Sequence, residues 1–189
     1  PLSKIIKAGT RRPTSPSVKQ GGLKWELPPS PIVEFAPQEE LPIDPYVLGL
    51  LLGDGCFKHG WAPTLSSSDP YILEYMENYC ASIGGKTTTY QIRDGFWTQY
   101  YGKADGTLHT GNQTSNPLRL KLQELGLDRA GTQDKFIPAQ YFLASPEDRL
   151  ALIQGLMDSD GNNLTHGAGG EFTNTSVSLV DGIEELVRS

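Results

Sequence analysis

Two helix-like apolar runs interrupt the mixed hydrophobic and polar pattern of this chain. The first, VLGLLLGDG, covers residues 47–55, and the second, IQGLMDSDG, covers residues 153–161. Each run ends at a glycine, a residue that commonly stops helices. The two runs match position by position at a constant offset of 106 residues. The pattern therefore predicts an internal repeat built around two helices.

Both predicted helices carry small residues one turn apart. Gly49 and Gly53 occupy positions i and i+4 of the first run, and Gly155 and Ser159 occupy the equivalent positions of the second. Small residues on one helical stripe let two backbones approach closely. We therefore expect Gly49 and Gly53 to pack on Gly155 and Ser159, with the helices side by side about a pseudo-twofold axis.

An acid precedes the terminal glycine of each run. Asp54 and Asp160 would face the negative end of a helix dipole, where a basic residue is favoured. Paired helices would bring these acids together, and a divalent cation would offset their repulsion. The same local rule is broken at two equivalent positions, which indicates a functional site. An EF-hand is excluded because DSDGNN would need glycine at its sixth position and an acid at its twelfth, but Gly161 is fourth and Gly169 is twelfth.

The repeat continues beyond the two runs. Residues 64–84 and residues 171–189 each predict a short strand, an N-cap and an amphipathic helix, with Asp69 and Ser176 as the N-caps. Only the first copy continues into a further pair of strands. The second copy stops at Ser189, so we expect this chain to be truncated or to be one piece of a larger protein.

A β-hairpin is predicted over residues 86–103, KTTTYQIRDGFWTQYYGK, with its turn at Asp94-Gly95. Pairing Arg93 with Phe96 across the turn divides the hairpin into two faces.

The two predicted faces differ in polarity. One is suited to packing on helices and carries Tyr90, Ile92 and Trp97. The other carries the candidate DNA contacts, namely Thr87, Thr89, Gln91, Arg93, Thr98 and Tyr100. A β-ribbon with such side chains fits the major groove of DNA. An ordinary strand face that meets only water is the alternative.

Charge is spread unevenly along the 189 residues, whose formal net charge is -6. The first 24 residues contain no acid and six basic residues, namely Lys4, Lys7, Arg11, Arg12, Lys19 and Lys24. The remaining chain is strongly acidic, with 10 basic and 22 acidic residues. A basic arm can follow phosphates, and a solvated leader explains the same composition equally well. Residues 1–44 are also rich in Pro and Gly, which predicts an extended lead-in.

Several classes of protein are disfavoured by the composition. The apolar stretches are too short to span a membrane, and no secretory segment opens the sequence. Cys56 and Cys80 have neither the spacing of a zinc site nor that of a disulfide framework. We therefore expect a cytoplasmic protein. The DNA contacts predicted for the hairpin would add association with the nucleoid when DNA is bound.

Together these segments resemble the double-motif LAGLIDADG homing endonucleases. VLGLLLGDG and IQGLMDSDG are similar to the paired motifs of that family. TQDKFIPAQYF resembles the Lys-Ile-Pro block that precedes the second motif in intein-encoded members, with Phe136 in place of the isoleucine. EFTNTSVSLVDGIEELVRS resembles the block that follows that motif. The resemblance covers about residues 40–189 and is weak over the first 40 residues.

The resemblance implies an α+β fold of two pseudo-symmetric halves, residues 45–130 and 131–189, with paired helices at the centre. Antiparallel sheets would form a platform for double-stranded DNA. Asp54 and Asp160, with Gly53 and Ser159, would bind Mg²⁺ and make a staggered double-strand break. Lys135 matches the lysine of the family and would polarise the attacking water or stabilise phosphate charge; a surface lysine is the alternative. Asp158 has no acidic partner in the first motif, because Leu52 holds the equivalent place, and is expected either to be structural or to support a metal ligand without binding the metal itself.

The resemblance also implies a monomer that is part of a larger intein-containing precursor. The second half lacks its hairpin, so half of the DNA platform is missing. Splicing is not expected of this chain alone, because it starts at Pro1 without a nucleophile and ends without a His-Asn pair. A non-cleaving nucleic-acid binder such as a maturase or regulator, and an inactive structural insert of an intein, are the alternative functions.

Overall fold

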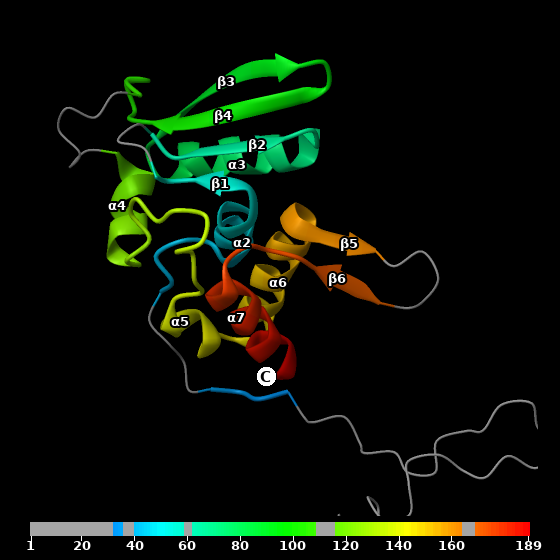
Figure 1. Cartoon of the computed structure of the whole chain (residues 1–189). Helices are drawn as coiled ribbons and strands as arrows, with labels where there is room; N and C mark the ends of the chain where they lie inside the picture. The colour runs from blue at the N-terminus through cyan, green and yellow to red at the C-terminus, as the bar shows by residue number, and fades with distance from the viewer. Residues whose placement is uncertain (1–31, 36–39, 59–61, 109–115, 164–168) are drawn as a thin grey trace, which may run out of the picture. The chain divides into compact units, whose positions relative to one another are not determined.

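The order helix, strand, strand, helix occurs twice along the chain (Figure 1). The first copy consists of α2 (Pro45–Asp54), β1 (Gly55–Cys56), β2 (Thr64–Ser67) and α3 (Pro70–Ser82). The second copy consists of α6 (Pro146–Asp160), β5 (Gly161–Asn163), β6 (Gly170–Phe172) and α7 (Val177–Arg188). The predicted helix, strand and second helix are therefore confirmed in both copies, and each copy has one further strand, β1 or β5, directly after its first helix.

The computed structural model describes residues 32–35, 40–58, 62–108, 116–163 and 169–189. The six basic residues of the predicted leader lie outside these ranges, as do residues 36–39 of the predicted lead-in. Residues 32–189 form one compact unit that contains both copies of the repeat. Within the described ranges, no helix is long and apolar enough to cross a membrane.

Three further segments lie between the two copies. The hairpin β3 (Lys86–Arg93) and β4 (Phe96–Gly102) joins the first copy, and α4 (Pro117–Glu124) and the short α5 (Ala139–Phe142) lead to the second. One antiparallel sheet has the order β1-β2-β4-β3, and β5 and β6 form a separate antiparallel pair. The structure is thus of the α+β class, with small antiparallel sheets.

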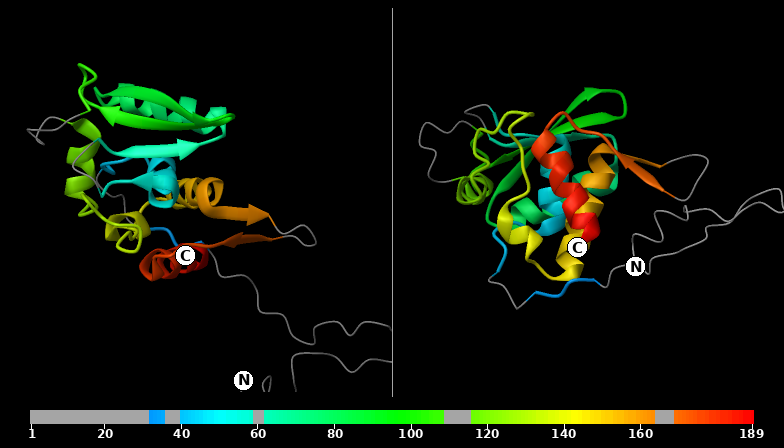
Figure 2. Two further views of the ribbon diagram at one scale, coloured as in Figure 1. Left: turned by 45° about the horizontal axis from the view of Figure 1, so that its top comes forward. Right: turned by 60° about the horizontal axis from the view of Figure 1, so that its bottom comes forward.

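Helices α2 and α6 lie side by side between the four-stranded sheet and α7 (Figures 1 and 2). Five consecutive or near-consecutive side chains of α2 are fully buried, namely Val47, Leu48, Leu50, Leu51 and Leu52. A helix that is apolar on all sides is a core helix, which explains why α2 lacks an amphipathic pattern. α2 is therefore the centre of the described unit.

Polar N-caps start the repeated helices. The Asp69 carboxylate accepts a hydrogen bond of 2.8 Å from the backbone N–H of Tyr71, and the Ser176 hydroxyl accepts one of 3.2 Å from that of Leu179. Each cap satisfies a donor that the first helical turn leaves without a partner. Both predicted N-caps are confirmed.

At the two glycines that follow the acids, the chain leaves each helix close to the backbone of the preceding turn. Gly55 and Gly161 have negative φ angles of -73° and -86°, so neither adopts the left-handed conformation common after helices. A Cβ atom at either glycine would lie 2.3 Å from a backbone oxygen, that of Leu51 or Met157. Glycine is needed here because the chain leaves the helix too tightly for a side chain.

The predicted hairpin turn is confirmed, but its strand register contains a bulge. Gly95 has a φ of +67° and Arg93 pairs with Phe96, as expected. The next pair is Gln91 with Trp97, so Ile92 is an extra residue in β3. One extra residue exchanges the two faces of a strand beyond the bulge.

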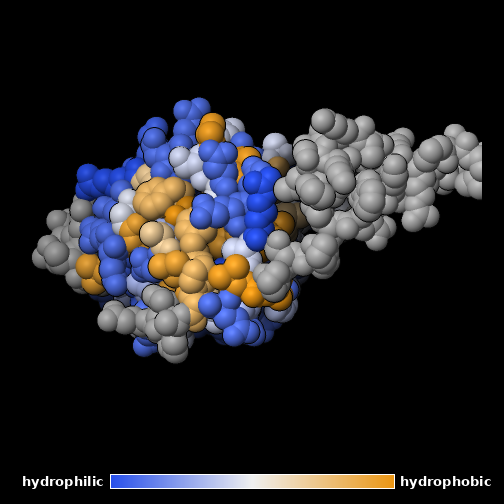
Figure 3. Space-filling model, turned by 90° about the horizontal axis from the view of Figure 1, so that it is seen from below, coloured by the Kyte–Doolittle hydropathy of each residue, from blue (hydrophilic) through white to orange (hydrophobic). Residues whose placement is uncertain are grey.

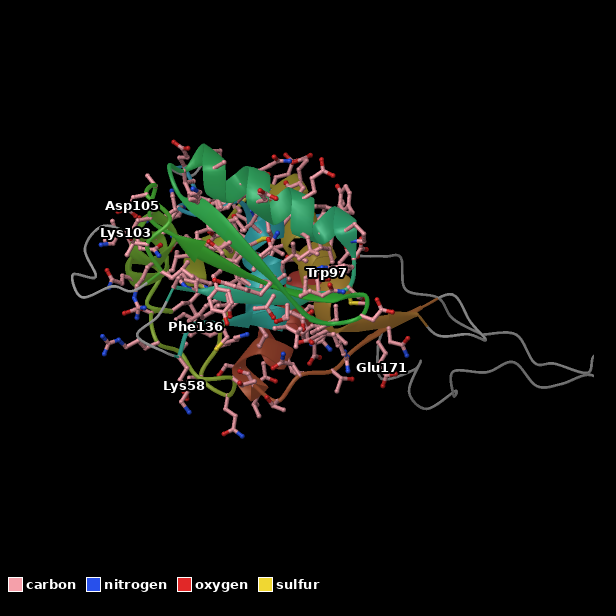
Figure 4. All side chains as sticks on the ribbon, turned by 90° about the horizontal axis from the view of Figure 1, so that it is seen from above. Lys58, Trp97, Lys103, Asp105, Phe136 and Glu171 are labelled. Carbon is pink, nitrogen blue, oxygen red and sulfur yellow. The ribbon has the colours of Figure 1, made fainter. Side chains whose placement is uncertain are left out.

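The predicted division of the hairpin faces was therefore partly wrong. Thr87, Thr89 and Gln91 share the face of Trp97 and of the buried Gln99, whose side-chain amide donates to the Leu73 carbonyl of α3 at 3.0 Å. In Figure 4, Trp97 lies on the side of the hairpin that α3 covers. The outer face carries three of the six candidate DNA contacts, namely Arg93, Thr98 and Tyr100. Tyr90, which was predicted to pack on helices, also lies on this outer face.

A separate apolar surface lies where α6 begins. The backbone N–H of Val33 donates to the Ser189 carbonyl at 2.8 Å, and the Arg149 guanidinium donates to the Val33 carbonyl. A hollow of about 510 Å³ beside this contact is lined by Ile32, Leu150, Ile153 and Val187, among others (Figure 3). It lies at the first turn of α6, whereas Asp160 is the last residue of that 15-residue helix. The apolar surface is therefore distinct from the acids.

Candidate metal centre

The close packing of α2 on α6 depends on two glycines. A Cβ atom at Gly49 would lie 2.5 Å from the carbonyl oxygen of Leu152, and one at Gly155 would lie 2.2 Å from that of Tyr46. Tyr46 and Leu152 are themselves equivalent at the repeat offset of 106 residues. The contacts are therefore reciprocal, as two parallel helices related by a pseudo-twofold axis require. The predicted helix interface is confirmed at both glycines.

The same interface brings the two helix ends together. A Cβ atom at Gly53 would lie 2.0 Å from Ser159 Oγ and 3.4 Å from Asp160 Oδ2. The Asp160 carboxylate thus lies against the last turn of α2, close to Gly53, the residue that precedes Asp54. The predicted meeting of the two acid-bearing tips is confirmed.

Asp54 reaches solvent, yet its carboxyl group ionises less readily than a free aspartate. Partial burial by surrounding protein atoms and the negative charge of Asp160 raise its pKa to about 6, while the Lys135 ammonium opposes this shift. The two acids therefore repel each other in the metal-free protein. A bound cation would relieve this repulsion.

Lys135 lies at the C-terminal end of α2 and is only 3% exposed. Its ammonium donates to the carbonyl oxygens of Leu51, Leu52, Gly53 and Gly55 at 3.2, 2.8, 2.9 and 2.7 Å. The alternative of a surface lysine is therefore wrong. Burial lowers the pKa of Lys135 to about 8, although the negative charges of Asp160 and Asp54 favour its charged form.

The buried ammonium explains how an acid can end α2. A cation at the negative end of the helix dipole stabilises the terminal carbonyl groups. Lys135 supplies this charge from outside the helix, so that Asp54 remains available at the tip. Its predicted catalytic role stays a prediction, since its three N–H groups are directed at backbone carbonyls.

Replacing Lys135 with methionine is expected to destabilise the protein by about 3 kcal/mol, because buried carbonyls at the end of α2 would lose a charged donor. Urea unfolding of the metal-free protein at pH 7 measures this change. Lys121→Met is the matched control, since the Lys121 ammonium donates to one partly buried carbonyl, that of Pro42, at 2.6 Å. Equal losses for the two variants would contradict the role assigned to Lys135.

Asn174 is a site residue that the sequence patterns did not reveal. Its side-chain N–H donates to Asp160 Oδ2 at 2.6 Å, and its side-chain oxygen accepts from the backbone N–H of Ser176 at 2.8 Å. The second contact is an Asx turn, a motif that could be anticipated from an asparagine two residues before an N-cap. The first contact depends on the packing of the β6–α7 loop on α6 and has no local signal.

Asp158 does not join the two acids. Its carboxylate accepts a hydrogen bond of 2.8 Å from the Tyr46 hydroxyl, which links α6 to the first turn of α2. The structural role expected for Asp158 therefore agrees with the geometry.

The donors at the two tips fit Mg²⁺. Within the described residues, no group of three or more His, Cys, Asp or Glu side chains could hold a metal. Mg²⁺ does not need such a group, because it is commonly bound by one or two carboxylates and completes its shell with water and substrate phosphates. Asp54 and Asp160 could supply the carboxylates, and the carbonyl oxygens of Gly53 and Ser159 lie on the same two turns.

The outer face of the hairpin combines aromatic rings with polar groups. The Arg93 guanidinium lies 4.8 Å from the ring centroid of Phe96, and the rings of Tyr90 and Tyr100 meet edge to face at 5.5 Å. The Thr98 hydroxyl is hydrogen-bonded to that of Ser66 at 2.7 Å. Such a ribbon can contact bases and phosphates. Thr87, Thr89 and Gln91 are placed on the opposite face and do not extend this surface.

The chain resembles parts of two longer proteins. It is 26% identical over 153 residues to a replicative DNA helicase DnaB of Mycobacterium intracellulare and 28% identical over 116 residues to one of Rhodothermus marinus. These regions cover 81% and 61% of this chain, but only 20% and 12% of the two helicases. No protein-family model matches the chain.

Proposed function

We propose that this chain is the endonuclease portion of a LAGLIDADG-type homing endonuclease and hydrolyses double-stranded DNA with Mg²⁺. The observation that carries the proposal is the pair of acids at the adjoining ends of two reciprocally packed helices. Neither acid serves the stability of its helix, because each opposes the helix dipole. A local rule that is broken at two equivalent positions is typical of a functional site.

Each residue of the site has a distinct task in this proposal. Asp54 and Asp160 would hold Mg²⁺ beside the DNA strands to be cut. Lys135 holds the end of α2 and adds positive charge near both acids. Mg²⁺, when bound, would activate water and stabilise the leaving 3′ oxygen.

DNA is the partner that the hairpin suits best. Its outer face presents Arg93, Thr98 and Tyr100. The major groove of DNA admits a two-stranded β-ribbon of this kind. The two similar proteins carry the name DNA helicase, which supports a DNA partner. Their greater length supports a chain that is one part of a larger precursor.

Helicase activity itself has little support in these residues. A nucleotide-binding P-loop has the pattern G-x-x-x-x-G-K-[ST] between a strand and a following helix. Gly85-Lys86-Thr87 completes only the end of this pattern, since Cys80 occupies the place of the first glycine. These residues also follow α3 and lead into β3, the reverse of the required order.

Selection from a plasmid library of randomised duplexes tests the proposal. With Mg²⁺ present, we expect cut ends to accumulate at one family of sequences, with a stagger between the strands. Cutting without sequence preference, or none at any sequence, contradicts the proposed function. Binding that enriches one sequence without cutting would instead favour the maturase or regulator alternative.

The selected duplex should also protect Cys56 from alkylation by a maleimide. Cys56 is exposed, follows Asp54 by two residues and pairs with Thr64 at the edge of the sheet. Cys80 is 1% exposed and serves as an internal control that stays unreactive with or without DNA. Unchanged labelling of Cys56 by the bound protein would place the DNA elsewhere.

A further inference from the structure

We propose that Asn174 is a positioning residue that fixes the Asp160 carboxylate and thereby makes the two half-sites unequal. This inference rests on the proposed function, because it assigns Asn174 a task in holding the cation. Asn174 itself would contact neither cation nor DNA.

The contact between Asn174 and Asp160 has one possible orientation. An ionised carboxylate only accepts hydrogen bonds, so the atom at 2.6 Å from Asp160 Oδ2 is the side-chain nitrogen. The side-chain oxygen then faces the backbone N–H of Ser176 at 2.8 Å, which can only donate. Both ends of the amide are satisfied, so its orientation is fixed by its partners. Among the described residues no hydrogen bond is made to Asp160 Oδ1, so this atom can bind a cation.

A hydrogen-bonded chain continues from Asn174 to the other half-site. The Ser176 hydroxyl donates to the backbone carbonyl of Lys135 at 2.6 Å, and Ser176 is fully buried. The Lys135 ammonium in turn donates to the carbonyl of Gly53, next to Asp54, at 2.9 Å. Asn174 is therefore anchored in the buried layer that also supports the end of α2. Its position should vary little between the metal-free and metal-bound protein.

The first half-site has no counterpart of this anchor. The residue equivalent to Asn174 is Ser67, at the repeat offset of 107 residues. Its hydroxyl accepts a hydrogen bond of 3.1 Å from the backbone N–H of Asp69, the same turn that Asn174 forms with Ser176. Across the part of the chain that the structure describes, no side chain donates a hydrogen bond to Asp54. One acid is thus held in place and the other is not.

This difference predicts unequal metal affinity and unequal cutting of the two strands. Removing a group that orients a metal ligand typically lowers metal affinity or activity 10–100-fold. The Asp160 carboxylate should therefore already have its metal-binding orientation before a cation binds. The Asp54 carboxylate should adopt its orientation only when the cation binds.

Titration with Mn²⁺ alone, followed by electron paramagnetic resonance of the free ion, tests the inference without DNA. For Asn174→Ala we expect at least about a tenfold loss of Mn²⁺ affinity. The matched control Ser67→Ala should leave the affinity unchanged. Thermal unfolding of each variant establishes that it is folded.

The possible results separate this inference from the proposed function. Failure of the natural protein to bind Mn²⁺, or binding that survives Asp160→Asn, overturns both. Loss of binding in Asp160→Asn with normal binding in Asn174→Ala overturns the inference alone, as does an equal loss of affinity in the control Ser67→Ala. Cleavage of each strand can be followed separately with the selected duplex labelled on one strand or the other. Asn174→Ala should slow cleavage of one strand more than cleavage of the other. Equal slowing of both strands would overturn the inequality of the half-sites.

Discussion

Replacing Asp54 or Asp160 with asparagine is expected to reduce Mg²⁺-dependent DNA cleavage at least 1000-fold. Asparagine keeps the size of the side chain but removes the negative charge that would hold the cation. Electrostatic stabilisation by a metal is worth several kcal/mol, and about 4 kcal/mol corresponds to roughly a thousandfold change in rate. Single-turnover cleavage of the selected duplex measures this loss.

The same variants should keep their DNA affinity, because the hairpin surface is unchanged. Asp158→Asn is a suitable control, since its hydrogen bond to Tyr46 joins two helices outside the acid pair. Cutting at the natural rate by both Asp54→Asn and Asp160→Asn would end the nuclease proposal. Loss of DNA binding together with cutting would show that the acids act on the fold rather than on the reaction.

Asp54→Asn should also stabilise the metal-free protein at neutral pH. Because the pKa of Asp54 is raised to about 6, the folded protein holds this proton more tightly than the unfolded chain does. The contribution of Asp54 to stability therefore falls as the pH rises from about 4 to about 6, and the penalty persists above pH 6. Removing a charge from the end of a helix adds about 0.3–1 kcal/mol, or roughly 1–4 °C in Tm.

Thermal unfolding at pH 5 and pH 8 in the presence of a chelator measures this effect. The gain in Tm should be larger at pH 8, where the natural Asp54 is ionised. A lower Tm for Asp54→Asn at pH 8 would mean that the carboxylate stabilises the fold, contrary to its place in the proposed site.

Gly155→Ala is expected to destabilise the protein by about 3 kcal/mol or more and to weaken Mn²⁺ binding. The new Cβ atom would lie 2.2 Å from the carbonyl oxygen of Tyr46, which belongs to the backbone of α2 and cannot turn aside. The helices must then separate, and overpacking of this kind usually costs about 1–3 kcal/mol, occasionally more. Separation would also move Asp160 away from α2. Urea unfolding and Mn²⁺ titration measure the two effects.

Gly182→Ala provides the control on another helix. A Cβ atom at Gly182 would meet the Ile137 side chain at 3.1 Å, and that side chain can shift by a few tenths of an ångström. Alanine is also favoured over glycine within helices by about 1 kcal/mol. We therefore expect little change in stability for Gly182→Ala. A similar cost for the two substitutions would contradict the close helix contact as the cause.

Local features of this protein were determined by its sequence alone. The spacing of Gly49, Gly53, Gly155 and Ser159 predicted the helix interface, because helical periodicity places residues four apart on one side. Asp69 and Ser176 predicted the helix starts, since an N-cap binds its own first turn. The hairpin turn at Asp94-Gly95 is local in the same way. Repetition added the one non-local conclusion, that the acids of two equivalent helices meet.

Three features were decided only by the tertiary structure. Lys135 binds carbonyls more than 80 residues earlier in the chain, so no local pattern could distinguish it from a surface lysine. The bulge at Ile92 exchanged the hairpin faces, because alternation predicts a face only when no residue is inserted. Asn174 reaches Asp160 through the packing of a loop on α6. Periodicity and capping depend on neighbours within one or two turns, whereas these contacts depend on how distant segments meet.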